Sequence, residues 1–368
     1  HDPIIVGVSS AVPPVSIDVV TINDFHGRIE ADGAAAGAAV VAGAVKQFRA
    51  ANPNTIFAGA GDLIGASTFT SFINDDNPTI DALNAAGLDV SAAGNHEFDQ
   101  GWEDLRDRVQ DRADWEYISS NVFLTETGEP ALAPAWVKEL DGVRVGFVGA
   151  VTEDLDSLVS PEGIAGLEVR SIVDSVNAVA DDLRDGDDSN GEADVVILLV
   201  HEGAESTELS AITPTSPLGE IVYGVDDDVD AIVSAHTHLA YNHVIDGRPV
   251  VSAGQYGENL GLMNLQVDPK TKELLSITNE IKPLTSAGKP VTLDVIGDVD
   301  EDSVLGAGSI QDFSWKGILD FTTCTECGRC QSQCPAWNTE KPLSPKLLIT
   351  ALRDHAHAAG DPKSEGHE

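Results

Sequence analysis

The sequence predicts an α/β fold built around a largely buried sheet. Short apolar runs rich in β-branched residues recur between residues 17 and 252, and each ends in a glycine or polar turn. Alanine-rich segments with amphipathic spacing lie between several of these runs. Strands that alternate with helices in this way are typical of a sheet whose faces are covered by helices.

The expected elements follow one another in a regular order. We expect strands at 17–22, 55–58, 90–93, 143–148, 195–200, 231–233 and 249–252. We expect helices at 38–51, 79–86 and 173–183, where small and apolar residues recur at helical spacing. Two later runs, 262–267 and 274–281, flank the polar stretch 268–272 and predict a hairpin.

The chain divides into five parts by composition. Residues 1–16, which contain three prolines, predict an extended lead-in, and residues 17–285 form the predicted main domain. Residues 286–310 are rich in Gly, Asp and Ser, as linkers are. A cysteine-containing segment follows at 311–359, with one expected helix at 344–359, and we expect a disordered tail at 360–368.

The composition excludes some classes of function. With 21 Lys and Arg against 61 Asp and Glu, the net charge is −40, which repels nucleic acid and anionic membranes. The longest apolar run, 195–200, is far shorter than the roughly 20 residues that cross a bilayer. The chain begins at His1 without a signal peptide, as we expect of a processed or trimmed protein.

Ligand-type side chains follow five of the predicted strands. Because ligands bind outside the carboxyl ends of strands in an open α/β sheet, we expect these side chains to meet. They are Asp24 and His26, then Asp62, then Asn95 and His96, then His201, and finally His236 and His238. Each one alone has a simpler reading as a structural polar residue at the start of a loop. Together they predict one site.

The residue types at this site suit divalent transition metals. Imidazoles, carboxylates and an amide form a mixed nitrogen and oxygen set, which favours Mn, Zn, Fe or Co over calcium. Two adjacent cations that share a carboxylate can clamp the attacking and leaving oxygens of a phosphoryl displacement. They also lower the pKa of a bound water.

The order and form of these motifs resemble those of calcineurin-like metallophosphoesterases. The fuller motifs at 21–27 and 94–99, which read TINDFHG and GNHEFD, resemble the 5′-nucleotidase/UDP-sugar hydrolase branch. The resemblance extends from residue 17 to about residue 284. It implies a four-layer α/β sandwich of two mixed sheets flanked by helices. A small, mostly helical or irregular C-terminal segment would follow the sandwich.

The resemblance also implies roles for individual residues. It assigns one metal to Asp24, His26 and His238, a second to Asn95, His201 and His236, and the bridge between them to Asp62. It makes His96 and Asp99 a catalytic pair that stabilises the transferring phosphoryl group, although Asp99 also reads as a solvated surface acid. The loop 254–258 resembles a family loop that we expect to be structural.

The implied reaction is hydrolysis of a small phosphate ester, of nucleotides or related phosphorylated molecules. Full-length 5′-nucleotidases continue into a second domain that binds the nucleoside. Here residues 285–368 remain, and they read differently. The resemblance therefore predicts the type of reaction more directly than it predicts the substrate class.

All four cysteines lie in the C-terminal segment, at Cys324, Cys327, Cys330 and Cys334, followed by Pro335. This C-x₂-C-x₂-C-x₃-C-P spacing is that of bacterial ferredoxins. Residues 286–358 resemble the cluster-binding region of heterodisulfide-reductase-like iron–sulfur oxidoreductases, which carry two such runs. For the single run here, a [4Fe–4S] cluster, bound zinc and free thiols are the alternatives.

Two other functional hypotheses remain open at this point. The chain could be an iron–sulfur electron-transfer module, or a fusion or scaffold with little catalytic activity. The phosphoesterase part favours a secreted or cell-envelope protein, whereas the cysteine segment favours the cytoplasm. We expect a small-molecule substrate and no nucleic acid partner.

Overall fold

The computed structural model of the chain describes residues 12–286 and 289–290. In β9 (Val195–His201) every residue is buried, and successive side chains enter different cores. Ile197 and Leu199 pack between two sheets, whereas Val196 and Leu198 face helices on the outside. Period-two alternation with apolar residues on both faces is what a strand buried on two sides requires.

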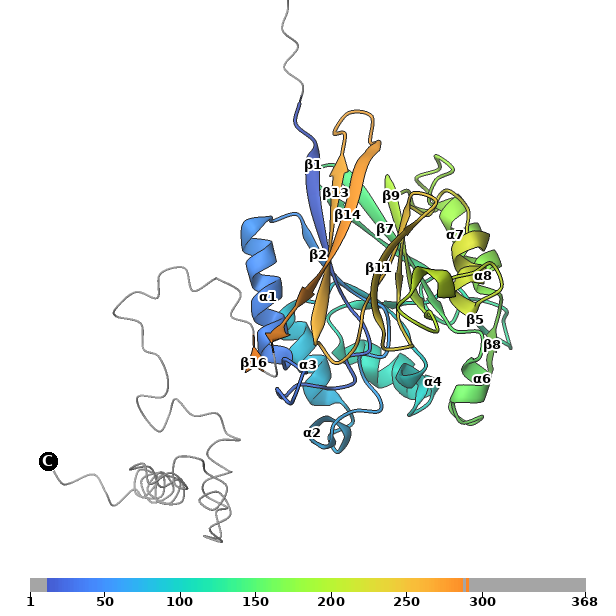
Figure 1. Cartoon of the computed structure of the whole chain (residues 1–368). Coiled ribbons are helices and arrows are strands. Elements are labelled where there is room, and N and C mark those ends of the chain that lie inside the picture. The colour runs from blue at the N-terminus through green and yellow to red at the C-terminus, as the bar shows by residue number, and fades with distance from the viewer. Residues whose placement is uncertain (1–11, 287–288, 291–368) are drawn as a thin grey trace, which may run out of the picture. The chain divides into compact units, whose positions relative to one another are not determined.

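Two six-stranded sheets form the centre of the fold, as Figure 1 shows. The first sheet has the order β14 (Leu274–Pro283), β13 (Asn259–Val267), β1 (Val15–Ile22), β2 (Thr55–Gly59), β3 (Val90–Ala92), β4 (Glu116–Ile118). The second has the order β11 (Ala240–Ile245), β12 (Arg248–Ala253), β10 (Ala231–Ser234), β9, β7 (Val143–Val151), β6 (Ala135–Leu140).

Both sheets are mixed. Strands β1 to β4 run parallel to one another, and β13 joins β1 antiparallel, with Ile17 opposite Leu265. In the second sheet β7, β9, β10 and β12 are parallel, and the edge strands β6 and β11 are antiparallel to their neighbours. The carboxyl ends of the parallel strands therefore form one edge in each sheet.

Helices cover the outer face of each sheet and complete four layers. Helices α1 (Ala38–Ala51) and α3 (Asn77–Ala86) pack on the first sheet, and α7 (Ile172–Asp182) and α8 (Pro217–Gly224) on the second. Three cores result, one between the sheets and one under each pair of helices. This is the α/β sandwich of two mixed sheets flanked by helices that the sequence predicts.

Shorter elements connect these layers. They are the helices α2 (Phe69–Phe72), α4 (Trp102–Asp104), α5 (Gln110–Arg112) and α6 (Leu155–Leu158), the 3₁₀ turns η1 (His96–Phe98) and η3 (Leu209–Ala211), and the π-helical turn η2 (Leu105–Val109). Strands β5 (Val122–Leu124) and β8 (Leu167–Val169) form a small separate sheet, as do β15 (Thr285–Ser286) and β16 (Lys289–Pro290).

The structure refines the sequence-based boundaries. The first strand starts at Val15, inside the predicted lead-in, and the β15–β16 pair lies where the predicted linker begins. The cysteine segment at 311–359, with Cys324, Cys327, Cys330 and Cys334, and the tail at 360–368 lie outside the described residues. Within the described residues, no helix has the length and apolar character needed to cross a bilayer.

Candidate metal centre

The predicted metal ligands come together where the two sheets meet at their carboxyl ends. Loops after β1, β2 and β3 of the first sheet, the last residue of β9 and the loop after β10 of the second sheet supply them. The side chains form two groups, each with donor atoms within 4.8 Å of one another, namely Asp24, His26 and His238, and Asp62, His201 and His236.

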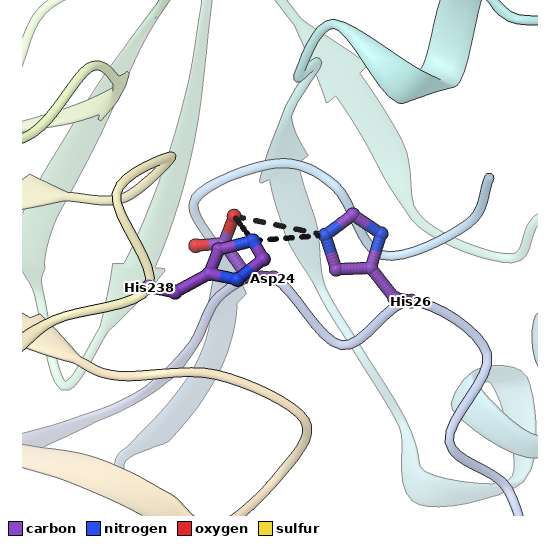
Figure 2. A group of neighbouring side chains, drawn as sticks. All are labelled: Asp24, His26 and His238. Carbon is purple, nitrogen blue, oxygen red and sulfur yellow. Dashed lines mark hydrogen bonds and ion pairs between the residues drawn. The ribbon is translucent and has the colours of Figure 1, made fainter. Parts of the chain in front are cut away.

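In the first group, three donor atoms converge from three directions, as Figure 2 shows. Nε2 of His26 and Nε2 of His238 lie 3.2 Å apart. Oδ1 of Asp24 lies 3.3 Å from Nε2 of His238 and 3.9 Å from Nε2 of His26. Asp24 and His26 follow a strand of the first sheet and His238 follows a strand of the second, so the group spans both sheets.

The second group centres on Nε2 of His201. This atom lies 3.0 Å from Oδ2 of Asp62, 3.3 Å from Nδ1 of His236 and 3.1 Å from Oδ1 of Asn95. His201 is fully buried, and Asn95 and Asp62 are nearly so. The amide of Asn95 therefore lies beside the second group.

Asp62 lies between the two groups. The same oxygen, Oδ2, that is 3.0 Å from His201 lies 3.7 Å from Nε2 of His26 in the first group. Its other oxygen, Oδ1, accepts a hydrogen bond from the backbone N–H of His96 at 2.8 Å. One carboxylate oxygen thus faces donors of both groups.

Backbone carbonyls fix the orientation of two of the imidazoles. Nδ1 of His26 donates to the carbonyl of Gly65 and Nδ1 of His201 to that of Ala60, each at 2.9 Å. Because a carbonyl only accepts, Nδ1 of each ring carries a proton, and Nε2 is the ring atom that faces the cluster. Metal-bound histidines are held by this kind of hydrogen bond.

Five of the ligand-type residues have a left-handed backbone. The φ angles are 49° at Asp24, 47° at His26, 52° at Asp62, 73° at His236 and 61° at His238. Non-glycine residues adopt this region infrequently, at a cost of about 1–3 kcal/mol each. Such strain concentrates at functional sites, where the surrounding structure holds it.

Two glycines allow the loops of the first sheet to approach each other. A Cβ atom at Gly61, where φ is 90°, would lie 2.6 Å from Nδ1 of His201 and 2.8 Å from Cα of Gly94. A Cβ atom at Gly94 would overlap Oδ1 of Asp62. Any side chain at either position would separate the loops that carry Asp62 and Asn95.

One buried atom in the cluster makes no hydrogen bond. Oδ2 of Asp24 accepts from the side chain of Asn23 at 2.7 Å and from the backbone N–H of His236 at 3.1 Å. Oδ1 of Asp24 is buried and accepts none. An unsatisfied buried carboxylate oxygen is costly, and a cation beside it removes that cost. The donor set therefore fits a metal ion.

The electrostatics of the cluster also favour a cation. Burial opposes the charge of His201, but the Asp62 and Asp24 carboxylates outweigh burial and raise the pKa of this imidazole to about 10. Burial also opposes the charge of Asp62, yet His201 and His26 lower the pKa of its carboxyl. Burial lowers the pKa of His26 and of His236, which keeps both in the neutral form that ligates metals.

His96 and Asp99 form a pair beside the metal ligands. Nδ1 of His96 hydrogen-bonds Oδ2 of Asp99 at 2.8 Å, and the two side chains are each about one-third exposed. The rings of His96 and His26 lie 5.2 Å apart, edge to face. The hydrogen bond to Asp99 raises the pKa of His96 to about 9. At neutral pH the ring is an imidazolium that borders the first group.

Glu97 lies in the motif at 94–99, but no role was predicted for it from the sequence. Its buried carboxylate accepts from the backbone N–H groups of Asp62 at 2.8 Å, Leu63 at 2.9 Å and Gly94 at 2.6 Å. It therefore ties the loop after β2 to the loop after β3. An acid inside the motif at 94–99, next to His96, is the sequence feature that could have indicated this role.

The loop 254–258 supports the cluster from the other side. The backbone N–H of Tyr256 donates to the carbonyl of Asp24 at 2.8 Å, and the side chain of Asn23 donates to the carbonyl of Gly254 at 2.6 Å. The Tyr256 ring lies 5.9 Å from that of His26 and 5.5 Å from that of His238. The loop thus contacts metal-ligand candidates directly.

Residues 17–240, which contain all of these ligand-type residues, match the sequence profile of the calcineurin-like phosphoesterase family. The chain belongs to the calcineurin-like phosphoesterase family. A dinuclear divalent metal site is part of what this family's fold implies, and the two His/Asp groups described above agree with it.

Relatives of this calcineurin-like phosphoesterase differ in their names. The protein named endonuclease YhcR of Bacillus subtilis is 29% identical over 290 residues, which cover 73% of this chain and 23% of that protein. The 5′-nucleotidase of Vibrio cholerae is 24% identical over 226 residues, which cover 60% of this chain and 40% of that protein. The chain therefore spans less than half the length of either relative.

Solved structures agree with the fold. The calcineurin-like phosphoesterase YfkN of Bacillus subtilis superposes with a TM-score of 0.62 and 24% identity, over 74% of this chain and 91% of that one. The 5′-nucleotidase precursor of Thermus thermophilus gives a TM-score of 0.60 and 23% identity, over 75% of this chain and 56% of that one. These likenesses concern the fold alone.

Proposed function

We propose that this chain hydrolyses phosphate esters with the help of two divalent metal ions. The observation that carries the proposal is the position of Asp62, one oxygen of which faces donors of two separate His/Asp groups. Two divalent cations held by these residues would supply Lewis acidity and a water of lowered pKa for phosphoryl transfer. Membership of the calcineurin-like phosphoesterase family supports the same reaction class.

We assign the ligands by group. Asp24, His26 and His238 hold one ion, Asn95, His201 and His236 hold the other, and Asp62 bridges them. The mixed nitrogen and oxygen donors suit Mn, Zn, Co or Fe. Buried carboxylates beside imidazoles, with two of the rings oriented by backbone carbonyls, support this assignment.

The catalytic pair would act on the charge of the phosphoryl group. His96 is held by Asp99 as an imidazolium at neutral pH, next to the first group. A fixed positive charge at this place stabilises the negative charge that develops on the transferring phosphoryl oxygens. Asp99 orients the His96 ring and keeps that ring protonated.

The proposed substrates are nucleotides or related small phosphorylated molecules. The 5′-nucleotidase names among the relatives support this class, although the chain spans 40% of the Vibrio protein. One relative is named an endonuclease. The net charge of −40 opposes binding of a nucleic acid, because few cations are available to replace the counterions of its phosphates.

A secreted or cell-envelope location is the proposal for the phosphoesterase part. A relative of 27% identity over 310 residues, covering 73% of this chain and 39% of that protein, is a cell wall protein of Listeria monocytogenes. The cytoplasmic expectation rested on the cysteine segment alone.

The iron–sulfur alternative is not favoured. The family match lies at residues 17–240 and ends well before Cys324. A [4Fe–4S] cluster takes four thiolates, and in two-cluster ferredoxins the fourth cysteine of such a run ligates the other cluster. The single run therefore suits a zinc ion better, and phosphoester hydrolysis requires neither.

The first experiment is hydrolysis of p-nitrophenyl phosphate and of its bis-ester by the purified chain. We expect turnover with Mn²⁺ or Co²⁺, complete loss after EDTA and dialysis, and recovery when either metal is added back. Protein treated with EDTA in the presence of excess Mn²⁺ is the control for other effects of the chelator. Full activity after exhaustive chelation, with no metal left in the protein, would refute the proposal.

A further inference from the structure

Arg28 differs from the other arginines of the described chain. Every other arginine within residues 12–286 forms an ion pair with an aspartate or a glutamate, including Arg49 with Asp89 at 2.8 Å and Arg170 with Glu168 at 3.2 Å. Among the same residues, Arg28 forms no ion pair. With 61 acidic residues in the chain, carboxylate partners are abundant, so this exception is informative.

The guanidinium of Arg28 is held in place by an aromatic ring instead. Its central carbon lies 4.1 Å from the centroid of the Tyr256 ring, a cation–π contact. Its Nε is buried and has no hydrogen-bond acceptor. A buried N–H without a partner is unfavourable, and an anionic acceptor would remove this cost.

This arginine borders the metal centre. Arg28 follows His26 by two residues, and the Tyr256 ring on which it stacks also contacts the rings of His26 and His238. On the other side, Arg28 and Tyr256 line a cavity of about 440 Å³ together with Thr68 and Phe69. The Phe69 side chain is exposed, with 76% of its surface accessible. Tyr256 thus contacts two metal-ligand candidates and also lines this cavity.

We propose that Arg28, stacked on Tyr256, binds a second anionic group of the substrate, a phosphate or a carboxylate carried by the leaving group. This inference rests on the proposed phosphoesterase function and refines its substrate class. The transferring phosphoryl group occupies the metal centre, and Tyr256 separates Arg28 from that centre. Arg28 would thus select esters with an anion on the leaving-group side.

The acidic residues of the cavity limit how much negative charge it accepts. Glu30, Asp32 and Glu258 also line it, yet none of them forms an ion pair with Arg28. A single extra anionic group gains the contact with Arg28, whereas a chain of several phosphates would meet these carboxylates. We therefore expect selection for one additional anion and not for polyphosphates.

The test compares three aryl phosphates that differ only at the para position. Phenyl phosphate has a neutral leaving group, 4-carboxyphenyl phosphate carries a carboxylate, and hydroquinone bisphosphate carries a second phosphate. We expect Arg28→Gln to lower kcat/KM roughly 10- to 100-fold for the two anionic esters, mainly through KM, the scale of a lost charge-assisted hydrogen bond. For phenyl phosphate, kcat/KM should change less than about twofold, the scale of a weak contact at the edge of a site.

Two further variants control the result. Arg28→Lys keeps the charge and should restore part of the preference, because lysine lacks the planar fork that stacks on Tyr256. Arg170→Gln removes another arginine that stacks on an aromatic ring, 3.7 Å from the centroid of Phe123, and that is ion-paired. Arg170→Gln should leave kcat/KM for all three substrates unchanged. Metal content is measured for every variant.

The outcomes separate this inference from the proposed function. An equal loss on all three esters would place Arg28 at the transferring phosphoryl group and overturn the inference, as would no loss at all. If the wild-type protein hydrolyses none of them, calorimetric binding of hydroquinone bisphosphate and phenyl phosphate to wild type and Arg28→Gln still decides. Tighter binding of the bisphosphate that disappears in the variant supports the subsite, and equal binding refutes it.

Discussion

Oδ2 of Asp99 lies 2.8 Å from Nδ1 of His96, and this one hydrogen bond sets the charge of the imidazole that borders the metal ligands. It is the largest cause of the rise in the pKa of His96 from its ordinary 6.5 to about 9. A histidine with a raised pKa keeps its proton up to the higher value, so His96 is positive throughout the neutral range.

The first prediction concerns the alkaline side of the pH–rate profile. If protonated His96 stabilises the phosphoryl group, activity falls as the pH rises through about 9, where the ring loses its proton. Asp99→Asn removes the main cause of the raised pKa and should move this fall towards 6.5, the ordinary value. The measurement is kcat against pH at saturating Mn²⁺. An unchanged alkaline limb in Asp99→Asn would contradict the role of this pair.

The second prediction separates charge stabilisation from metal binding. His96→Ala should keep both metal ions and lower kcat by roughly 10²- to 10³-fold, the effect of removing one preorganised group that stabilises transition-state charge. His243→Ala is a matched control, because His243 lies on β11 and contacts Thr207 instead of the cluster. Metal content by mass spectrometry and steady-state kinetics are the measurements. Loss of metal with a proportionate loss of rate would make His96 a ligand.

The third prediction tests the bridge. Asp62→Ala should lose both ions together, because one oxygen of Asp62 faces both groups. His238→Ala removes a donor of the first group only and should weaken one ion while the other remains. Titration of metal-free protein with Co²⁺ gives the stoichiometry and the affinities. Two equivalents bound to Asp62→Ala at wild-type affinity would remove Asp62 from its proposed position.

The fourth prediction concerns Glu97, which touches no substrate position and acts through other residues. Glu97→Gln places an NH₂ group against backbone N–H donors of Asp62, Leu63 or Gly94, so at least one of these hydrogen bonds is lost. We expect weaker binding of both ions and a lower melting temperature, with kcat at saturating metal close to wild type. Glu97→Asp, which keeps the charge, should recover part of the affinity.

A purely structural role for Glu97 would give a different pattern. In that case the melting temperature would fall while the metal affinities stayed at their wild-type values. Asp89→Asn is a suitable comparison, since Asp89 is a partly buried carboxylate that binds Arg49 and Lys138 outside the metal centre. It should lower stability without changing metal affinity.

Much of the fold could be predicted because the central strands are apolar on both faces. Runs such as 195–200 have no polar position, and the helix at 38–51 matches α1 to the residue. The edge strand β11 was missed because Asn242 and His243 interrupt its apolar residues, so that no apolar run forms. The three-residue strands β4, β5 and β8 are too short to show a period.

One helix could have been found from its first two residues. Helix α8 begins at Pro217, and the side chain of Ser216 accepts a hydrogen bond from the N–H of Gly219, the usual start of a helix. The site followed a similar rule. The ligands at strand ends could be predicted because topology alone brings them together, whereas the roles of Glu97 and Arg28 depend on contacts between loops.

The cluster has a mechanical consequence as well as a chemical one. Each group of ligands takes residues from both sheets, so a bound ion cross-links the two halves of the sandwich at one edge. Because the ions bind the folded chain, they stabilise it by mass action. Removal of the metal ions should then give faster amide hydrogen exchange in the loops of both sheets together, including the loops after β1 and β10. The number of bound metal ions would therefore set how firmly the two sheets are held together at this edge.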